Sequence, residues 1–336
     1  MASAGANAGV TAATLGESTS EGTFGTGANS ARIGCARPYE TPAKTKMSTP
    51  ADIDLSGPPD GLGVLAFRGV DAAKFLQGQL SANIEKLVAG ASTLAGLHNP
   101  QGRVVAVLAV ARASADELLA VLPRELAAGV AQRLRKFVLR SKVSIDEAPD
   151  DYRVLGSENA SSPTGTASIA WGTRRLLLMP RGHLGDAGVT DPVAVAHWQM
   201  TDIVEGLPQV YAATSEAFVA QMLNLDLLGA IAFDKGCYTG QEVIARAHYR
   251  GRVKRRMQRW LNPGDVALKP ADTARGPDGR ALTVVRVAAR PDGQQEILAV
   301  GNFTSVHDSA AEIPAATETS GPEVRGPLPL PYSLPD

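Results

Sequence analysis

The part of the chain that most limits its fold is residues 255–306, where short runs of Val, Leu and Thr alternate with turn signals. Pro-Gly, Pro-Asp-Gly and Asp-Gly sequences interrupt these runs at short intervals. Turns of this kind join antiparallel strands, and several short strands in succession form a sandwich or a barrel. The pattern predicts a small all-β domain, which we interpret as a β-barrel over residues 255–308.

Upstream of this domain, strand and helix signals mix without the regular βαβ alternation of a doubly wound sheet. Residues 62–67 are apolar enough for a strand, and two apolar runs flank the turn-rich residues 99–102, which is typical of a hairpin. Helical patterns follow at about 192–205 and 214–227. The sequence therefore predicts an α+β region over residues 51–254, followed by the barrel.

Both ends of the chain differ from this folded part in composition. Ala, Gly, Ser and Thr make up more than half of the first 46 residues, and the large apolar residues there are isolated. Such a segment buries too little surface to offset its ordering entropy, so we expect a disordered tail over residues 1–50. Residues 309–336 are rich in proline, which predicts an extended C-terminal tail.

Composition excludes several classes of protein. A formal net charge of −1 argues against a protein whose whole surface binds nucleic acid. Two cysteines cannot form a disulfide framework or hold an iron–sulphur cluster alone, so we expect no permanently bound metal. No run of 18 apolar residues is present, which argues against a membrane span. We expect a cytoplasmic monomer that does not bind membranes.

One segment, residues 233–246, has the features of a functional loop. Gly236 and Gly240 bracket Cys237, and glycines allow a positive φ or a close approach of a ligand to the backbone. P-loop, His-Glu-x-x-His and Gly-x-Ser-x-Gly motifs are absent from the sequence, and its five histidines have no metal-ligand spacing. The loop is therefore the first candidate for chemistry.

A helix is expected to begin within this loop. Thr239 and Glu242 have the spacing of a capping box, which would place Cys237 just ahead of the helix N-terminus. Unpaired N–H groups there favour a thiolate, and Lys235 adds a nearby cation. We interpret Cys237 as a reactive thiol assisted by Lys235; the alternative is a structural cysteine in a tight turn.

Cations are concentrated directly downstream, with seven and no acid in residues 246–259. Such a strip suits phosphates, a nucleic-acid backbone or a polycarboxylate tail. The alternative is a solvated face whose charges are balanced by acids elsewhere. The cations are Arg246, Arg250, Arg252, Lys254, Arg255, Arg256 and Arg259.

The loop also resembles a known signature. Lys235-Gly236-Cys237-Tyr238-Thr239-Gly240-Gln241-Glu242, followed by Ala245-Arg246 and Tyr249-Arg250-Gly251, is similar to the motif of the YgfZ family. These are folate-binding proteins linked to iron–sulphur cluster maturation and tRNA modification, and they are relatives of the glycine-cleavage T-protein, an aminomethyltransferase. The resemblance extends over about residues 60–335, including Phe75-Leu76-Gln77-Gly78-Gln79-Leu80, His98-Asn99-Pro100-Gln101-Gly102-Arg103 and Glu205-Gly206-Leu207-Pro208.

The resemblance implies a fold and a cofactor. It implies a folate-binding region of two similar halves, with a break near residue 150, and tetrahydrofolate in a central opening. Trp198 matches an aromatic residue near the folate, where stacking on a pterin explains its use. A second family aromatic is replaced here by Leu62. The residues implied at the cofactor are Trp198, Lys235, Gly236, Tyr238, Gly240, Gln241, Glu242 and Arg246.

A comparison with the T-protein decides between two activities. The general-base aspartate of that enzyme follows the hairpin turn, whereas residues 104–108 of this chain contain no carboxylate. We therefore expect a tetrahydrofolate-binding accessory protein for assembly or repair of iron–sulphur enzymes, including tRNA-modifying ones. The alternatives are a folate-dependent aminomethyl or one-carbon transferase and an RNA-binding module. Arg250, Arg252 and Lys254 are expected to bind an anionic partner, and the 246–259 strip to contact tRNA.

Overall fold

Near-continuous apolar runs form the three central strands of the first sheet, which are buried on both faces. On β4, Leu108 faces a core covered by two helices, whereas the next residue, Ala109, faces a second sheet. All neighbouring strands pair antiparallel, in the spatial order β3-β4-β5-β2-β6. The elements are β2 (Leu62–Arg68), α1 (Ala72–Gln77), β3 (Ser92–His98), β4 (Val104–Arg112), β5 (Glu117–Pro123), α2 (Arg124–Arg135) and β6 (Ser144–Glu147).

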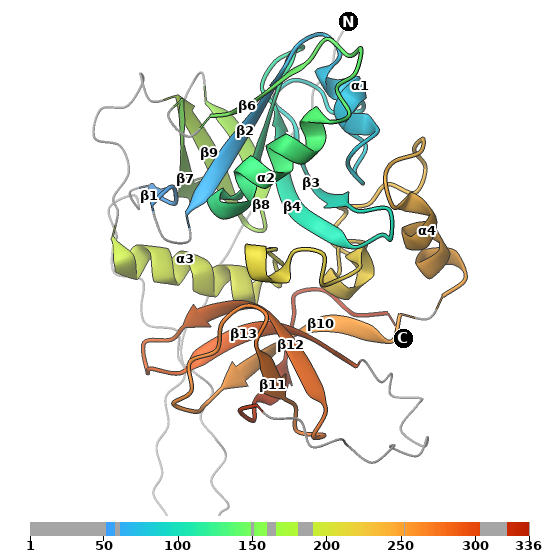
Figure 1. Ribbon diagram of the computed structural model, residues 1–336. Helices are drawn as coiled ribbons and strands as arrows, with labels where there is room; N and C mark the ends of the chain where they lie inside the picture. The colour runs from blue at the N-terminus through green and yellow to red at the C-terminus, as the bar shows by residue number, and fades with distance from the viewer. Residues whose placement is uncertain are drawn as a thin grey trace, which may run out of the picture. The chain divides into compact units, whose positions relative to one another are not determined.

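A second antiparallel sheet packs against the first. Val64 and Ala109 of the first sheet share a buried cluster with Val154, Ile169 and Leu176 of the second. The two sheets therefore enclose an apolar layer between them. Figure 1 shows the strands of the two sheets side by side. The second sheet has the order β1-β7-β9-β8, with β1 (Ile53–Asp54), β7 (Tyr152–Ser157), β8 (Ala167–Trp171) and β9 (Arg174–Pro180).

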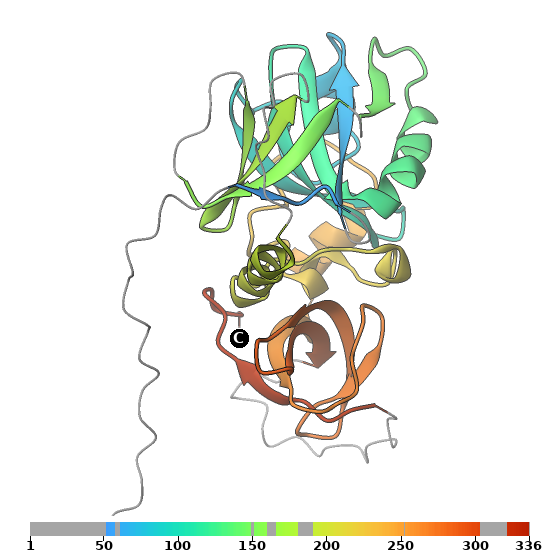
Figure 2. The same ribbon diagram turned by 90° about the vertical axis from the view of Figure 1, so that its left-hand side faces the viewer.

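The C-terminal strands form a third sheet that curls into a half-barrel (Figure 2). Its interior is apolar and includes Leu282, Val284, Ile297 and Ala299. The order is β11-β12-β13-β10-β14, with β10 (Arg255–Asn262), β11 (Thr273–Arg275), β12 (Ala281–Ala289), β13 (Gln295–Asn302) and β14 (Arg325–Leu328). This agrees with the predicted all-β C-terminal domain in its type of structure.

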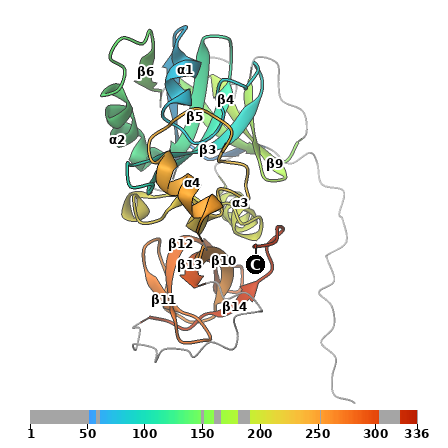
Figure 3. The ribbon, with the colours of Figure 1, turned by 90° about the vertical axis from the view of Figure 1, so that its right-hand side faces the viewer.

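Helix α3 (Pro192–Val204) lies between the half-barrel and the two sheets (Figures 1 and 2). It packs on β12 on one side and on β1 on the other. The Asp191 side chain caps its N-terminus by accepting from the Val193 N–H. Proline occupies the first turn, where a backbone N–H would have no partner within the helix, so its absence costs no hydrogen bond. Helix α4 (Gln241–Tyr249) lies elsewhere, beside the β3–β4 hairpin (Figure 3).

The structure describes residues 52–57, 61–148, 151–159, 166–180, 191–251, 253–302 and 321–335. The expected disordered tail falls outside these ranges, as does the first part of the expected C-terminal tail. Residues 321–335 do not form a separate tail, because β14 pairs with β10 and Val324 is buried in the half-barrel. The boundary expected at residue 308 is therefore too early.

One further expectation needs correction. The helix expected over residues 214–227 is wrong: this segment contains 3-10 turns at Ala212–Thr214 and Ala220–Leu223. Asn224 ends the second turn with φ +56, which interrupts any longer helix. The described residues do not confirm the two similar halves: residues 62–147 supply a five-stranded sheet, and the described part of residues 151–254 supplies three strands and two helices.

No helix in the described part of the chain is long and apolar enough to cross a membrane.

Candidate functional site

A cavity of about 300 Å³ lies where α3, the β1–β2 connection and the half-barrel meet. This volume is at the lower end of the range for small-molecule sites. Most of the lining is apolar, which favours a ligand with a flat or hydrophobic body. The lining residues are Asp54, Leu55, Gly57, Gly61, Leu62, Pro123, Trp171, Pro192, Val195, Ala196, Trp198, Gln199, Asp202, Gln209, Tyr211 and Arg286.

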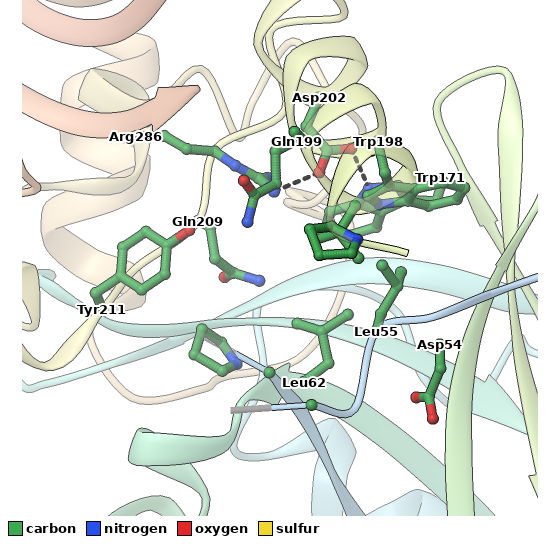
Figure 4. A pocket seen from close by; sticks show the side chains of 16 residues that line it. Asp54, Leu55, Leu62, Trp171, Trp198, Gln199, Asp202, Gln209, Tyr211 and Arg286 are labelled. Atoms are coloured by element: carbon green, nitrogen blue, oxygen red, sulfur yellow. Dashed lines mark hydrogen bonds and ion pairs between the residues drawn. The ribbon is translucent and has the colours of Figure 1, made fainter. Parts of the chain in front are cut away.

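The cavity has a polar side and an apolar side (Figure 4). The amides of Gln199 and Gln209 point into the same space, with Leu55 and Leu62 opposite them. Gln209 is buried and its Oε1 accepts from the Val210 N–H at 3.1 Å. Among the described residues, the Gln209 Nε2 and the whole Gln199 amide have no hydrogen-bond partner, so both remain available to a bound molecule.

Asp202 holds one wall of the cavity in place. Its Oδ1 accepts from Trp171 Nε1 at 2.7 Å and from Arg174 Nη2 at 2.5 Å. Its Oδ2 accepts from Arg286, which reaches across from β12. Burial opposes the charge of Arg286, but the Asp202 carboxylate outweighs it and raises the pKa of that guanidinium. The wall is a buried ion cluster in which both oxygens of the Asp202 carboxylate accept hydrogen bonds from neighbouring side chains.

Trp198 is fixed by its neighbours on two sides. Its side chain is 3% exposed, and the Arg174 guanidinium lies 3.9 Å from the ring centroid. A Cβ on Gly156 would lie 2.7 Å from the ring, so only glycine fits there without displacing the indole. Arg174 therefore occupies one face of the ring, and little of the Trp198 surface is exposed to a ligand.

Lys235 is held by three backbone carbonyl groups that are distant from it in the sequence. Its Nζ donates to the carbonyl oxygens of Gln77 at 2.6 Å, Leu80 at 2.7 Å and Ala82 at 2.8 Å. Burial lowers the pKa of Lys235 to about 8, so the ammonium is still charged at neutral pH. These three bonds join the loop to the end of α1 and to the segment that follows it. The expected assistance of Lys235 to Cys237 stays a prediction.

Helix α4 begins later than the sequence indicates. Its N-cap is Gly240 with φ +82, no side chain caps it, and the expected capping box of Thr239 and Glu242 is absent. A Cβ on Gly240 would lie 2.6 Å from the Asn99 carbonyl oxygen, so glycine is required by this close approach. Cys237 is a free, exposed thiol that lies ahead of the N-cap, three residues from it instead of the expected two.

The remaining loop residues are divided between the interior and the surface. Burial raises the pKa of Tyr238 to about 12, and its ring centroid lies 6.2 Å from that of His98. The Gln241 Oε1 accepts from the Tyr238 N–H at 3.3 Å. Gly236, Glu242 and Arg246 are exposed. Of the residues implied at the cofactor, Trp198 lines the cavity, and none of the loop residues does.

The basic strip is not one continuous surface. Arg246, Arg250 and Lys254 are exposed, whereas Arg256 is buried and paired with Asp226 at 2.9 Å. Arg259 is also paired, at 2.6 Å from Glu296. Both arginines lie on β10, where acids hold them, so neither is available to an exposed strip. Arg252 lies outside the described residues.

Of the cavity residues, sequence reasoning named only Leu62 and Trp198, and four of those it missed are Trp171, Gln209, Tyr211 and Arg286. They come from three separate segments, and nothing local distinguishes three of them from ordinary strand or loop residues. Trp171 is the exception. A buried indole N–H requires an acceptor, and Asp202, which lies four residues after Trp198 on the same face of α3, is that acceptor.

Comparisons with known proteins agree with this fold. No model of a known protein family matches the chain. An uncharacterized protein from Haemophilus influenzae is 33% identical over 202 residues, which cover 58% of this chain and 69% of that protein. The crystal structure of glycine cleavage system aminomethyltransferase T from Bartonella henselae matches with a TM-score of 0.56 and 11% identity over 75% of this chain and 78% of that one. The second match shows a shared fold.

Proposed function

The chain belongs to the same protein family as the uncharacterized Haemophilus influenzae protein, and we propose that it is a tetrahydrofolate-binding accessory protein for iron–sulphur enzymes. One observation carries the folate half of the proposal. Leu62 and Trp198, which are far apart in the sequence, line the same cavity, and these are the two positions that the sequence resemblance associates with folate. The aminomethyltransferase-like fold supports it at a coarser level.

The cavity fits the chemistry of a pterin ring. A pterin is a flat bicycle whose pyrimidine edge carries N–H donors and a carbonyl acceptor, and a primary amide offers the complementary acceptor and donors. Leu62 and Trp198, which line the cavity, would contact the ring, while Gln199 and Gln209 would bind its polar edge. When bound, tetrahydrofolate supplies nitrogen atoms that carry one-carbon units.

The positions of the carboxylates in the cavity favour a protein that binds folate over one that transfers an aminomethyl group. Two carboxylates, Asp54 and Asp202, are among the described lining residues. Asp202 is held by Trp171 and two arginines, and Asp54 turns its carboxylate away from Trp171 and Trp198 (Figure 4). Strand β4 adds no acid. A base for deprotonating an amine is therefore lacking among these groups. Turnover of an aminomethyl donor by the purified chain would favour the transferase instead.

The iron–sulphur half of the proposal rests on the YgfZ resemblance and on the exposed thiol of Cys237. An exposed, unpaired cysteine is accessible to a client protein. Arg246, Arg250 and Lys254 lie on or just after the same helix and would contact an anionic partner, including tRNA. In cells that lack the wild-type gene, Cys237→Ser should lower the activity of client cluster enzymes while the purified variant melts like wild type. Unchanged client activity would contradict a role for the thiol.

Thermal melting of the full chain with tetrahydrofolate tests the folate half. A ligand that binds only the folded state raises Tm with its concentration, so a dose-dependent rise is expected. p-Aminobenzoylglutamate, which lacks the pterin, should give a much smaller rise. If neither compound raises Tm while RNA binds and is released by salt, the RNA-binding alternative replaces this proposal.

A further inference from the structure

Three apolar side chains are exposed together at the end of the first sheet that lies away from α3. Val70 follows β2, and Phe137 and Leu139 lie in the turn between α2 and β6. Their exposed fractions are 66%, 49% and 91%. Figures 1 and 3 show α1 and the connection from α2 to β6 at this end of the molecule. These residues contribute little to the core, so their apolar character calls for another explanation.

Hydrogen bonds hold the two segments side by side. The Lys142 N–H donates to Asp71 Oδ2 at 2.7 Å, and the Asp71 N–H donates to the Lys142 carbonyl oxygen at 3.3 Å. Within the turn, the Ser141 N–H donates to the Val138 carbonyl oxygen at 2.8 Å, and Val138 packs against the core. Leu139 therefore sits at the tip of an anchored turn, with φ +21, an unusual value for a leucine.

The two segments that carry these apolar side chains also carry exposed cations. Lys74, Lys136, Arg140 and Lys142 are exposed, and none of them forms an ion pair with a described residue. Neighbouring arginines outside the group are paired, as in Arg68–Glu117, Arg133–Glu216 and Arg135–Glu147. The only acid in residues 69–74 and 136–142 is Asp71, which is bonded to the Lys142 N–H. The exposed charge of the two segments is thus strongly positive.

We propose that this surface, the Leu139 patch (Val70, Lys74, Lys136, Phe137, Leu139, Arg140 and Lys142), binds a partner protein whose contact surface combines apolar and acidic side chains. An apolar centre with a charged rim is the usual anatomy of a protein interface. The unpaired cations of the patch complement acids, and its small size fits a transient complex. The inference does not depend on folate binding, because the patch shares no residue with the cavity.

A protein fits better than an anionic lipid surface or a nucleic acid. In the sequence, Asp71 directly follows Val70 and precedes Lys74 by three residues. A uniform layer of anionic headgroups on this segment would repel the Asp71 carboxylate. A protein can place its carboxylates beside the cations and leave Asp71 free of close negative charge. A nucleic acid would use the cations and stack on Phe137, but it has no use for exposed Val70 and Leu139.

Peptide selection with the full chain tests the proposal. A random peptide library displayed on phage is selected on wild-type protein and counter-selected on Leu139→Asp. We expect the recovered peptides to combine Asp or Glu with Leu, Phe or Trp. Measured by fluorescence anisotropy, they should bind wild type at least about tenfold more tightly than Leu139→Asp and lose affinity as salt rises. Leu139 is so exposed that Leu139→Asp should melt like wild type.

Val266→Asp is the matched control, because Val266 is also apolar and 60% exposed but lies in the half-barrel segment. It should bind the selected peptides like wild type. The proposal is overturned if no peptides are enriched, if those enriched lack acids, or if Leu139→Asp binds them equally well. It is also overturned if wild type, but not Leu139→Asp, sediments with phosphatidylcholine–phosphatidylserine vesicles while the peptides do not bind. That result would identify the patch as a lipid-binding surface.

Discussion

Asp202 on α3 and Arg286 on β12 form a buried ion pair that joins the central helix to the half-barrel. The Asp202 side chain is 1% exposed, and the same carboxylate also binds Arg174 and the indole of Trp171. One acid therefore connects three parts of the structure and fixes a wall of the candidate folate cavity.

Replacing Asp202 should destabilise the whole chain. Asp202→Ala leaves two buried guanidinium groups without this carboxylate, which costs about 3–5 kcal/mol of unfolding free energy. Urea unfolding followed by tryptophan fluorescence measures the change. Asp116→Asn, at an exposed turn, should alter the unfolding free energy by less than about 0.5 kcal/mol. Equal stability of the two variants would show that the cluster does not join the parts.

Lys235 should prove more important for stability than for thiol chemistry. Lys235→Met removes the donor to three carbonyl groups and should cost about 2–4 kcal/mol. Lys86→Met is the control, because the exposed Lys86 forms a 2.9 Å ion pair with Asp234 on the same loop and should cost at most about 1 kcal/mol. If Lys235→Met keeps wild-type stability but changes the rate at which Cys237 reacts with a disulfide reagent, Lys235 assists the thiol after all.

His98 should make stability depend on pH. Burial lowers its pKa to about 4, and neither ring nitrogen has a hydrogen-bond partner among the described residues. Between pH 4 and the unfolded value near 6.5, the unfolded state binds more protons, so stability falls as the pH falls. His98 alone should cost about 2 kcal/mol between pH 7 and pH 5.

Urea unfolding of wild type and His98→Phe at both pH values isolates this contribution. The loss of stability on acidification should be smaller in His98→Phe, while His197→Gln, an exposed control, should behave like wild type. An identical loss in wild type and His98→Phe would contradict a neutral buried His98.

Gly156 should control the position of Trp198. A side chain at this position would collide with the indole, so Gly156→Val should shift Trp198 and weaken tetrahydrofolate binding by about tenfold or more. Gly129→Ala on α2 is the control, since a Cβ there meets nothing within 4 Å and alanine favours the helix. Unaltered affinity in Gly156→Val would show that Trp198 does not form a wall of the folate site.

Local patterns were sufficient to predict much of the fold. The apolar run at β2, the hairpin of β3 and β4, and the proline-started α3 depend on neighbouring residues, and the structure has each of them at nearly the expected bounds. The error at residues 214–227 has a cause that the helical period of the sequence does not show. Asn224 adopts a left-handed conformation and donates through Nδ2 to the Met257 carbonyl oxygen, a contact between distant segments.

The candidate site was harder to predict because it depends on contacts between distant segments. Trp198 could be named because of a family resemblance. Gln209 and Arg286 line the cavity because the half-barrel packs on α3, which the sequence does not show. The loop around Cys237 stood out in the sequence because of its glycines, and the structure explains one of them by packing: Gly240 approaches the hairpin backbone closely. A conspicuous motif therefore reflected tertiary structure as well as possible chemistry.

The most direct test of the central claim is calorimetric titration of the full chain with tetrahydrofolate in wild type and two variants of α3. Ala196→Trp places an indole in the cavity, whereas Val193→Trp places one at a position that is 75% exposed on the same helix. We predict one-to-one binding to wild type and Val193→Trp and little or none to Ala196→Trp. Equal binding to all three proteins, or none to wild type, would contradict a folate site in this cavity.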